Sequence, residues 1–266
     1  MTQPDTTSQA AKAAKFRALH ERDGAFVIAN PWDAGSARLL GELGFEALAT
    51  SSGASAAVRG KKDGQLTRDE ALAHAREIVA ATDLPVAADL ENGFGESPAH
   101  VAETIRLAAE TGLVGASIED FTGDKARPFY ELDLAVERIV AAVEAARALP
   151  FAFTLTARCE HFLRGNADLG ATIARLQAYE AAGADVLFAP ALPDLESIRA
   201  VCAALKKPLN FMAGIPGKSF SVAALAGVGV KRISLATSLY RAAMKAAREA
   251  ANEVRTTGSF GFIDRL

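Results

Sequence analysis

Short apolar runs alternate along the chain with longer, alanine-rich amphipathic stretches. The runs have the composition of buried strands and cover residues 26–29, 47–50, 86–88, 115–118, 151–156, 186–189, 209–212 and 232–235. The stretches between them have helical spacing and cover 34–43, 68–81, 98–111, 134–149, 169–182, 194–205 and 222–226. This alternation is typical of parallel strands joined by crossover helices.

Glycine and proline mark the boundaries of these elements. Gly112 and Gly183 follow helical stretches, where a left-handed helix terminator is expected, and Pro85 and Pro150 stand directly before strands. Eight such units without a visible linker favour an α/β fold of the (β/α)8 TIM-barrel type, which commonly takes about 250 residues.

The pattern divides the chain into three parts. Residues 1–11 are polar and are predicted to form a loose tail, and residues 12–240 a catalytic barrel. Residues 241–266 continue a helical pattern and end in a tail with Phe260, Phe262 and Ile263. These apolar side chains indicate either an oligomer contact or docking on the same chain.

Composition narrows the classes of partner. The net charge is −3 and no basic cluster stands out, which argues against nucleic acid. No run is apolar enough for a membrane span or a signal peptide, and two cysteines fit a reducing cytoplasm. A small anionic substrate would therefore need positive charge from a metal ion or from single arginines.

Three carboxylates follow neighbouring predicted strands. Asp89 and Glu91 close the third run and Glu119 closes the fourth. Strand ends at the carboxyl edge of a barrel form its active site, and carboxylates held together there repel one another unless a cation intervenes. Mg²⁺ prefers such oxygen ligands, with Mn²⁺ as the alternative. The competing interpretation is that single acids pair with Arg158 or cap a helix.

Arg158 closes the otherwise apolar fifth run. An arginine there needs an anionic partner, so it is predicted either to bind a substrate carboxylate or to form an ion pair with Glu160 or Glu119. The two roles are compatible. Cys159 is expected to point to the other side of the strand and to serve packing.

Polar groups at other strand ends complete the candidate site. Ser51, Ser52 and Gly53 offer hydroxyl and backbone N–H groups that could hold a carboxylate, or they could form a simple turn. Asn210 lies in the seventh run and is a candidate substrate ligand.

Two polar, glycine-bearing loops, 59–64 and 121–128, lie beside the acid cluster. Such loops often close over a site, although they could equally be solvated. Lys125 or Arg127 would then bring positive charge to the substrate, and Asp63 is a further candidate. His161 is expected to lie outside the reacting groups.

Together these motifs resemble the isocitrate lyase/phosphoenolpyruvate mutase superfamily over about residues 26–240. The matching segments are Asn30-Pro-Trp-Asp33, Ser51-Ser-Gly53, Asp63, Ala88-Asp89-Leu-Glu-Asn-Gly-Phe-Gly95, Ser117-Ile-Glu-Asp120 and Arg158-Cys-Glu-His-Phe-Leu-Arg-Gly165. The resemblance implies a (β/α)8 barrel whose last helix is exchanged within a homodimer or homotetramer. It also implies Mg²⁺ near Asp89, Glu91 and Glu119, and a 2-oxo acid or enolate on the metal.

Departures from the family pattern bear on the reaction. The cleaving lyases carry Lys-Arg-Cys-Gly-His after the fourth strand, where this chain has Lys125 but Arg127 in place of the cysteine. Isocitrate and methylisocitrate lyase activities are therefore not expected. The phosphonate mutases carry a histidine after the sixth strand, where this chain has Ala189-Pro-Ala191. Where the family usually carries an Asp-x-Asp pair, this chain carries Asp89-Leu-Glu91.

Three functions follow from this sequence. The first is a Mg²⁺-dependent carbon–carbon lyase or decarboxylase that acts on a small 2-oxo or 2-hydroxy carboxylate through a metal-stabilised enolate. Its catalytic residues would be Arg158, Lys125, Asp63 and Glu119. The second is a mutase or hydrolase that acts on a phosphorus–carbon bond, and the third is a non-catalytic carboxylate-binding protein.

Overall fold

Eight parallel strands form the wall of a barrel in the computed structural model, which describes residues 6–265. The strands are β1 (Phe26–Ile28), β2 (Leu48–Ala49), β3 (Val86–Asp89), β4 (Gly115–Glu119), β5 (Thr154–Arg158), β6 (Val186–Phe188), β7 (Leu209–Met212) and β8 (Arg232–Ser234). They pair in the order β1-β8-β7-β6-β5-β4-β3-β2. A parallel bridge between Ala29 and Leu48 joins β1 to β2, so the (β/α)8 barrel is nearly closed, as predicted.

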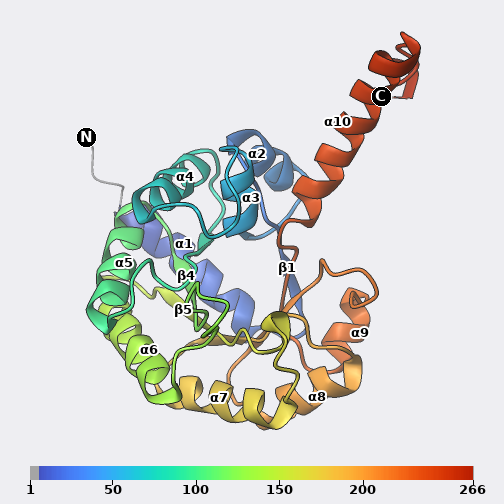
Figure 1. The fold of residues 1–266 in the computed structure, drawn as a ribbon. Coiled ribbons are helices and arrows are strands. Elements are labelled where there is room, and N and C mark those ends of the chain that lie inside the picture. The colour runs from blue at the N-terminus through green and yellow to red at the C-terminus, as the bar shows by residue number, and fades with distance from the viewer. Residues whose placement is uncertain (1–5, 266) are drawn as a thin grey trace.

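Helices surround this wall (Figure 1). They are α2 (Ala34–Glu42), α3 (Ser52–Ala57), α4 (Arg68–Ala80), α5 (Pro98–Glu110), α6 (Leu132–Arg147), α7 (Leu169–Ala181), α8 (Leu195–Ala204) and α9 (Val222–Gly227). Local side chains fix several of their starts, because the side chains of Asp33, Thr67 and Ser97 each accept a hydrogen bond from a first-turn N–H.

Helix α1 (Thr6–Glu21) lies across the amino-terminal end of the barrel. Phe16 and Leu19 are buried there against Phe26, Ala87 and Val114. The helix begins at Thr6, so residues 6–11, which the sequence pattern assigned to a loose tail, lie within it.

Helix α10 (Ser238–Thr257) projects away from the barrel, as Figure 1 shows in red. None of its residues is buried, and Met244 is exposed together with Phe260 and Ile263 beyond the helix. An exchange of this helix between subunits stays a prediction. Within residues 6–265, no helix combines the length and apolar character that a membrane crossing needs.

Candidate active site

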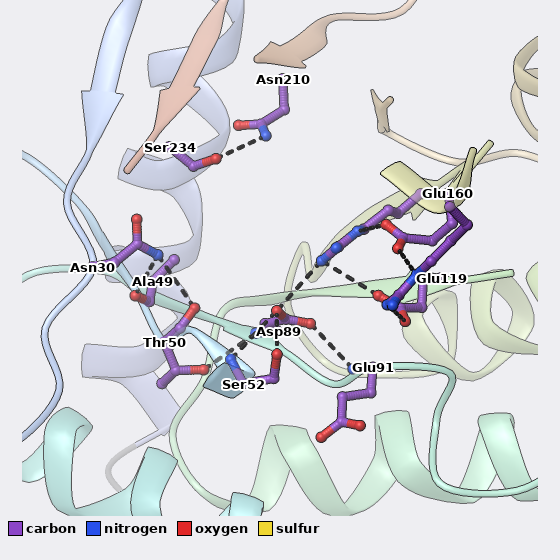
Figure 2. Close-up of polar contacts among 12 residues, drawn as sticks. Asn30, Ala49, Thr50, Ser52, Asp89, Glu91, Glu119, Glu160, Asn210 and Ser234 are labelled. Carbon is purple, nitrogen blue, oxygen red and sulfur yellow. Dashed lines mark hydrogen bonds and ion pairs between the residues drawn. The ribbon is translucent and has the colours of Figure 1, made fainter. Parts of the chain in front are cut away.

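Asp89 ends β3 at the carboxyl edge of the barrel. Its Oδ2 accepts hydrogen bonds from the hydroxyl and the backbone N–H of Ser52, at 3.0 and 3.4 Å, and its Oδ1 accepts one from the N–H of Glu91 at 3.2 Å. The carboxylate therefore faces the start of α3 (Figure 2). The segment expected to be a simple turn or nest is in fact this short helix, with Ser51 preceding its first turn.

Arg158, at the end of β5, joins three carboxylates. Its Nε donates to Glu160 Oε1 at 2.5 Å, and its Nη1 lies 3.3 Å from Glu119 Oε2 and 3.4 Å from Asp89 Oδ2. Burial alone lowers the pKa of Arg158, but the three carboxylates more than offset this, so its pKa is raised. Within the described residues, its Nη2 has no hydrogen-bond partner.

Glu119 and Glu160 share a second guanidinium. Arg164 Nε donates to Glu160 Oε2 at 2.8 Å, and Arg164 Nη2 lies 3.9 Å from Glu119 Oε1. Glu160 is fully buried between the two arginines. Burial raises the pKa of Glu119 well above its ordinary value, although Arg158 opposes the shift. The cluster therefore favours an additional positive charge near Glu119.

Glu91 occupies a left-handed backbone conformation, with φ at +49°. Burial, followed by the charges of Asp89 and Asp63, raises the pKa of its carboxyl group to about 8. In Figure 2 the Glu91 side chain extends away from Asp89. Strain of this kind persists only where the surroundings hold the backbone in place.

Arg138, from α6, holds the segment that follows Glu91. It is 1% exposed, and its guanidinium donates to the backbone carbonyls of Asn92, Gly95 and Glu96, at 2.7 Å for Gly95. The guanidinium also lies over the ring of Tyr130, 4.1 Å from its centroid. This contact explains how a glycine-rich loop stays ordered without secondary structure.

A cavity of about 270 Å³ opens beside Asp89 and Arg158 and reaches into the barrel. The residues that line it include Asn30, Ser51, Ser52, Gly53, Asp63, Asn210, Arg232, Ser234 and Thr237. Asn210 is buried in β7, where its amide donates to Ser234 Oγ at 3.1 Å. The structure therefore brings the predicted serines, Gly53, Asp63 and Asn210 to one cavity.

Lys125 and Arg127 belong to the loop between β4 and α6, and both are exposed. Lys125 lines an open hollow on the outer side of the carboxylates, together with Glu91, Glu119 and Arg164. Arg127 pairs instead with Asp124, at 3.7 Å. Of the two cations expected from this loop, Lys125 is thus the one that borders the carboxylate cluster.

A second group of metal-binding residue types is buried beside the cluster. Ligand atoms of Asp120, Cys159 and His161 lie within 4.8 Å of one another. The Asp120 carboxylate already accepts hydrogen bonds from Tyr179, Arg175 and the Glu160 N–H. Burial raises the pKa of the Cys159 thiol well above its ordinary value. These contacts make Asp120 a structural acceptor, and Cys159 packs in the core.

The donor set around Asp89 suits a divalent cation better. Asp89, Glu91, Glu119 and Glu160 face the two guanidiniums of Arg158 and Arg164, and with all four carboxylates ionised this is an excess of two negative charges. Burial and this excess together raise the pKa values of Glu91 and Glu119 as long as no cation is bound. Glu91 makes no ion pair within the described part of the chain. A hard divalent ion with oxygen ligands would balance this excess.

Sequence reasoning missed two arginines that shape the site. Arg138 sits in the middle of an amphipathic helix, and Arg232 opens the eighth apolar run. The available signal was a charged residue at a position that the periodicity assigns to the core, since a buried arginine needs several acceptors.

Comparison with known proteins places this barrel in a family. The model of the phosphoenolpyruvate phosphomutase family matches residues 16–255. An oxaloacetate decarboxylase of Paraburkholderia xenovorans is 33% identical over 91% of this chain and 82% of its own length. The 2-methylisocitrate lyase of Escherichia coli K12 is 31% identical over 92% of this chain and 84% of its own length.

Solved structures of similar proteins point to the same family. A Burkholderia cenocepacia J2315 protein, provisionally described as a lyase or mutase, is 56% identical with a TM-score of 0.96, over 98% of this chain and 93% of its own. An oxaloacetate acetylhydrolase, solved with its product oxalate, is 28% identical with a TM-score of 0.87, over 97% and 90%. These relatives support lyase or mutase chemistry. This chain belongs to the phosphoenolpyruvate phosphomutase family, within the isocitrate lyase/phosphoenolpyruvate mutase superfamily.

Proposed function

We propose that this protein is a Mg²⁺-dependent lyase that cleaves or decarboxylates a small 2-oxo or 2-hydroxy carboxylate. The observation that carries the proposal is the excess of carboxylates around Arg158, at the mouth of a polar cavity. Relatives named for oxaloacetate and 2-methylisocitrate support this class of substrate.

In this proposal Asp89, Glu91 and Glu119 hold the ion. When bound, Mg²⁺ would act as a Lewis acid and orient substrate oxygens. Mn²⁺ has similar preferences for carboxylate ligands and could replace it.

The chain itself binds the substrate carboxylate in two places. Arg158 offers its Nη2, because Nε and Nη1 are held by Glu160, Glu119 and Asp89. Ser51 and Gly53 offer a hydroxyl and N–H groups at the start of α3, beside Ser52, whose own hydroxyl and N–H donate to Asp89, and Asn210 offers its amide from β7. Donors fixed in this way stabilise negative charge that develops during bond cleavage without reorganising.

Two rim residues complete the proposal. Asp63 lines both the cavity and the outer hollow, and Lys125 borders the hollow. We assign them to proton transfer and to charge balance as the loop after β4 closes. Glu119, whose pKa is raised by burial, lines the same hollow as Asp63 and Lys125, and its Oε2 lies 3.3 Å from Nη1 of Arg158.

Calorimetric titration of Mg²⁺ into the Asp89→Asn variant tests the metal site. Loss of measurable Mg²⁺ binding is expected, because asparagine removes the negative charge of the Asp89 side chain but keeps its size. Asp83→Asn is the matched control, since Asp83 is fully exposed. Unchanged Mg²⁺ affinity in Asp89→Asn would remove the basis of the proposal.

A substrate panel then separates the reactions. Turnover of 2-oxo dicarboxylates with release of CO₂ or a smaller oxo acid supports the lyase. Conversion of phosphonopyruvate, followed by ³¹P NMR, would instead indicate phosphorus–carbon chemistry. Tight oxalate binding with no turnover of any of these compounds would indicate a carboxylate-binding protein.

A further inference from the structure

Arg232 lies inside the barrel, at the start of β8, and is 6% exposed. Its Nε donates to Asn210 Oδ1 at 2.8 Å and its Nη2 donates to Thr156 Oγ1 at 2.9 Å. Its Nη1 lies 3.3 Å from Nε2 of His20, on helix α1. Inside the barrel, the guanidinium therefore links β7 and β5 to α1.

All three partners of Arg232 are neutral. Arg158, Arg164 and Arg175 each pair with carboxylates, but Arg232 forms no ion pair anywhere in residues 6–265. Burial lowers its pKa to about 9, and burial also lowers the pKa of His20, to about 3. A buried cation without a counter-ion is costly, so such groups are usually paired with an anion.

The guanidinium has donors to spare. An arginine carries five N–H groups. Three of them are used by Asn210, Thr156 and His20, which leaves one on Nη1 and one on Nη2. Two N–H groups are the number that a bidentate carboxylate needs.

The cavity gives a ligand access to Arg232, at the floor of the barrel near α1. Arg232 is among the residues that line the same cavity of about 270 Å³ that opens beside Asp89. Its walls include the small side chains of Ala49, Ala87 and Ser117. Barrel interiors are usually filled by bulky branched residues, so this one keeps space open between its two ends.

We propose that Arg232 forms a second anion subsite on the floor of the barrel, which takes a carboxylate group. Thr156 and Asn210 hold the guanidinium plane, and neutral His20 closes it from below. The carboxylate has two sources: the far end of a dicarboxylate whose near end lies at Asp89, or a separate small monocarboxylate. Only the first source rests on the proposed function.

Calorimetry on the full chain tests the subsite. Formate, oxalate, succinate and glutarate are titrated with Mg²⁺ present in a chloride-free HEPES buffer, because chloride could bind at Arg232 and HEPES offers only a bulky sulfonate. In the Arg232→Gln variant we expect formate or the longer diacids to bind roughly ten- to hundredfold more weakly, the loss of a charge-assisted hydrogen-bond pair. Oxalate, which is too short to leave the upper site, should keep its affinity. Arg22→Gln, a change at an exposed surface pair with Glu46, is the control.

The four anions distinguish the two possible sources of the carboxylate. Formate that binds together with oxalate, and loses affinity in Arg232→Gln, indicates a separate monocarboxylate. Weakening confined to succinate or glutarate indicates the far carboxylate of the substrate. Equal affinities of wild type and Arg232→Gln for all four anions would overturn the subsite, while loss of oxalate binding in both would count against the proposed function instead.

A measurement on the unaltered protein covers the case in which Arg232→Gln does not fold. With EDTA present, formate should raise the thermal unfolding midpoint of the wild type relative to the bulky sulfonate HEPES at equal ionic strength, because a ligand that binds only the folded state stabilises it. Equal midpoints across formate, chloride and HEPES would contradict the subsite.

Discussion

Arg158 and Glu160 form the shortest ion pair of the site, with 2.5 Å between Nε and Oε1. Glu160 is fully buried and is held on its other oxygen by Arg164. The pair fixes the rotation of the Arg158 guanidinium, which directs Nη1 at Asp89 and Glu119. The arginine is thus both a structural ion pair and a candidate substrate ligand, and the two interpretations of the sequence are compatible.

Replacing Arg158 by lysine should separate charge from geometry. The charge survives, but a single ammonium group cannot serve Glu160, Glu119 and a substrate carboxylate together. We expect oxalate to bind about tenfold to a hundredfold more weakly, measured by calorimetry with Mg²⁺ present. Arg147→Lys, at the exposed pair with Asp185, is the control. Wild-type oxalate affinity in Arg158→Lys would assign Arg158 a purely structural role.

Arg138→Met should loosen the loop that carries Glu91. Three backbone carbonyls would lose their donor, and the ring of Tyr130 would lose its cation. We expect the free energy of unfolding to fall by roughly 3 kcal/mol in urea titrations, as for other broken buried networks. Mg²⁺ affinity should fall as well.

The control for this change is Arg106→Met, because Arg106 forms an exposed ion pair with Glu103 on the surface of α5. If Arg138→Met lost stability but kept its Mg²⁺ affinity, metal binding by Glu91 would not depend on the hydrogen bonds from Arg138 to its loop.

His20 should make the stability of the protein depend on pH. Burial and the charge of Arg232 lower its folded pKa from 6.5 to about 3. Above pH 6.5 the residue is neutral in both states and its contribution is complete. Below pH 6.5 only the unfolded chain takes up the proton, so stability falls as the pH drops toward 3, by about 2 kcal/mol between pH 7 and 5.

Urea titrations at pH 7 and pH 5 measure this loss, and His20→Gln provides the comparison, because a glutamine oxygen accepts from Arg232 but does not titrate. The wild type should lose about 2 kcal/mol more than the variant over this interval. Parallel losses in the two proteins would show that His20 takes up its proton in the folded state.

Gly115 tests the packing of α1 against the barrel. A Cβ at this position would lie 2.7 Å from the carbonyl oxygen of Thr154 and 3.0 Å from the ring of Phe16. Gly115→Ala should therefore lower the unfolding free energy by about 1–3 kcal/mol, the usual effect of overpacking. Gly227→Ala is the control, since nothing lies within 4 Å of its Cβ, and it should change stability by less than about 1 kcal/mol.

The barrel was predictable because its signal is local. Each strand is a short apolar run and each helix has its own periodicity, and eight alternations admit few arrangements. Asp89, Glu119 and Arg158 followed from the same logic, because strand ends at one edge of a barrel must lie near one another. The short helix α3 was missed because its six residues are too few to show a period.

Contacts across the barrel could not be predicted in the same way. The hydrogen bonds of Arg232 to Thr156 and His20 join residues that are distant in sequence, and no periodicity encodes them. The same holds for Arg138, whose acceptors are backbone carbonyls and so leave no trace in residue type. The sequence pattern predicts whether a segment is a strand or a helix, but not which partners its side chains reach inside the barrel.

The strand order has a consequence for synthesis of the chain. Phe26 pairs with Arg232 and Ile28 with Ser234, so the first strand finds its main partner more than 200 residues later. Closing so long a loop is entropically expensive and slow. In a ribosome-bound chain, β1 therefore lacks its partner strand until residue 234 has emerged. A truncation between β7 and β8 would leave β1 without its ladder and Asn210 without Arg232.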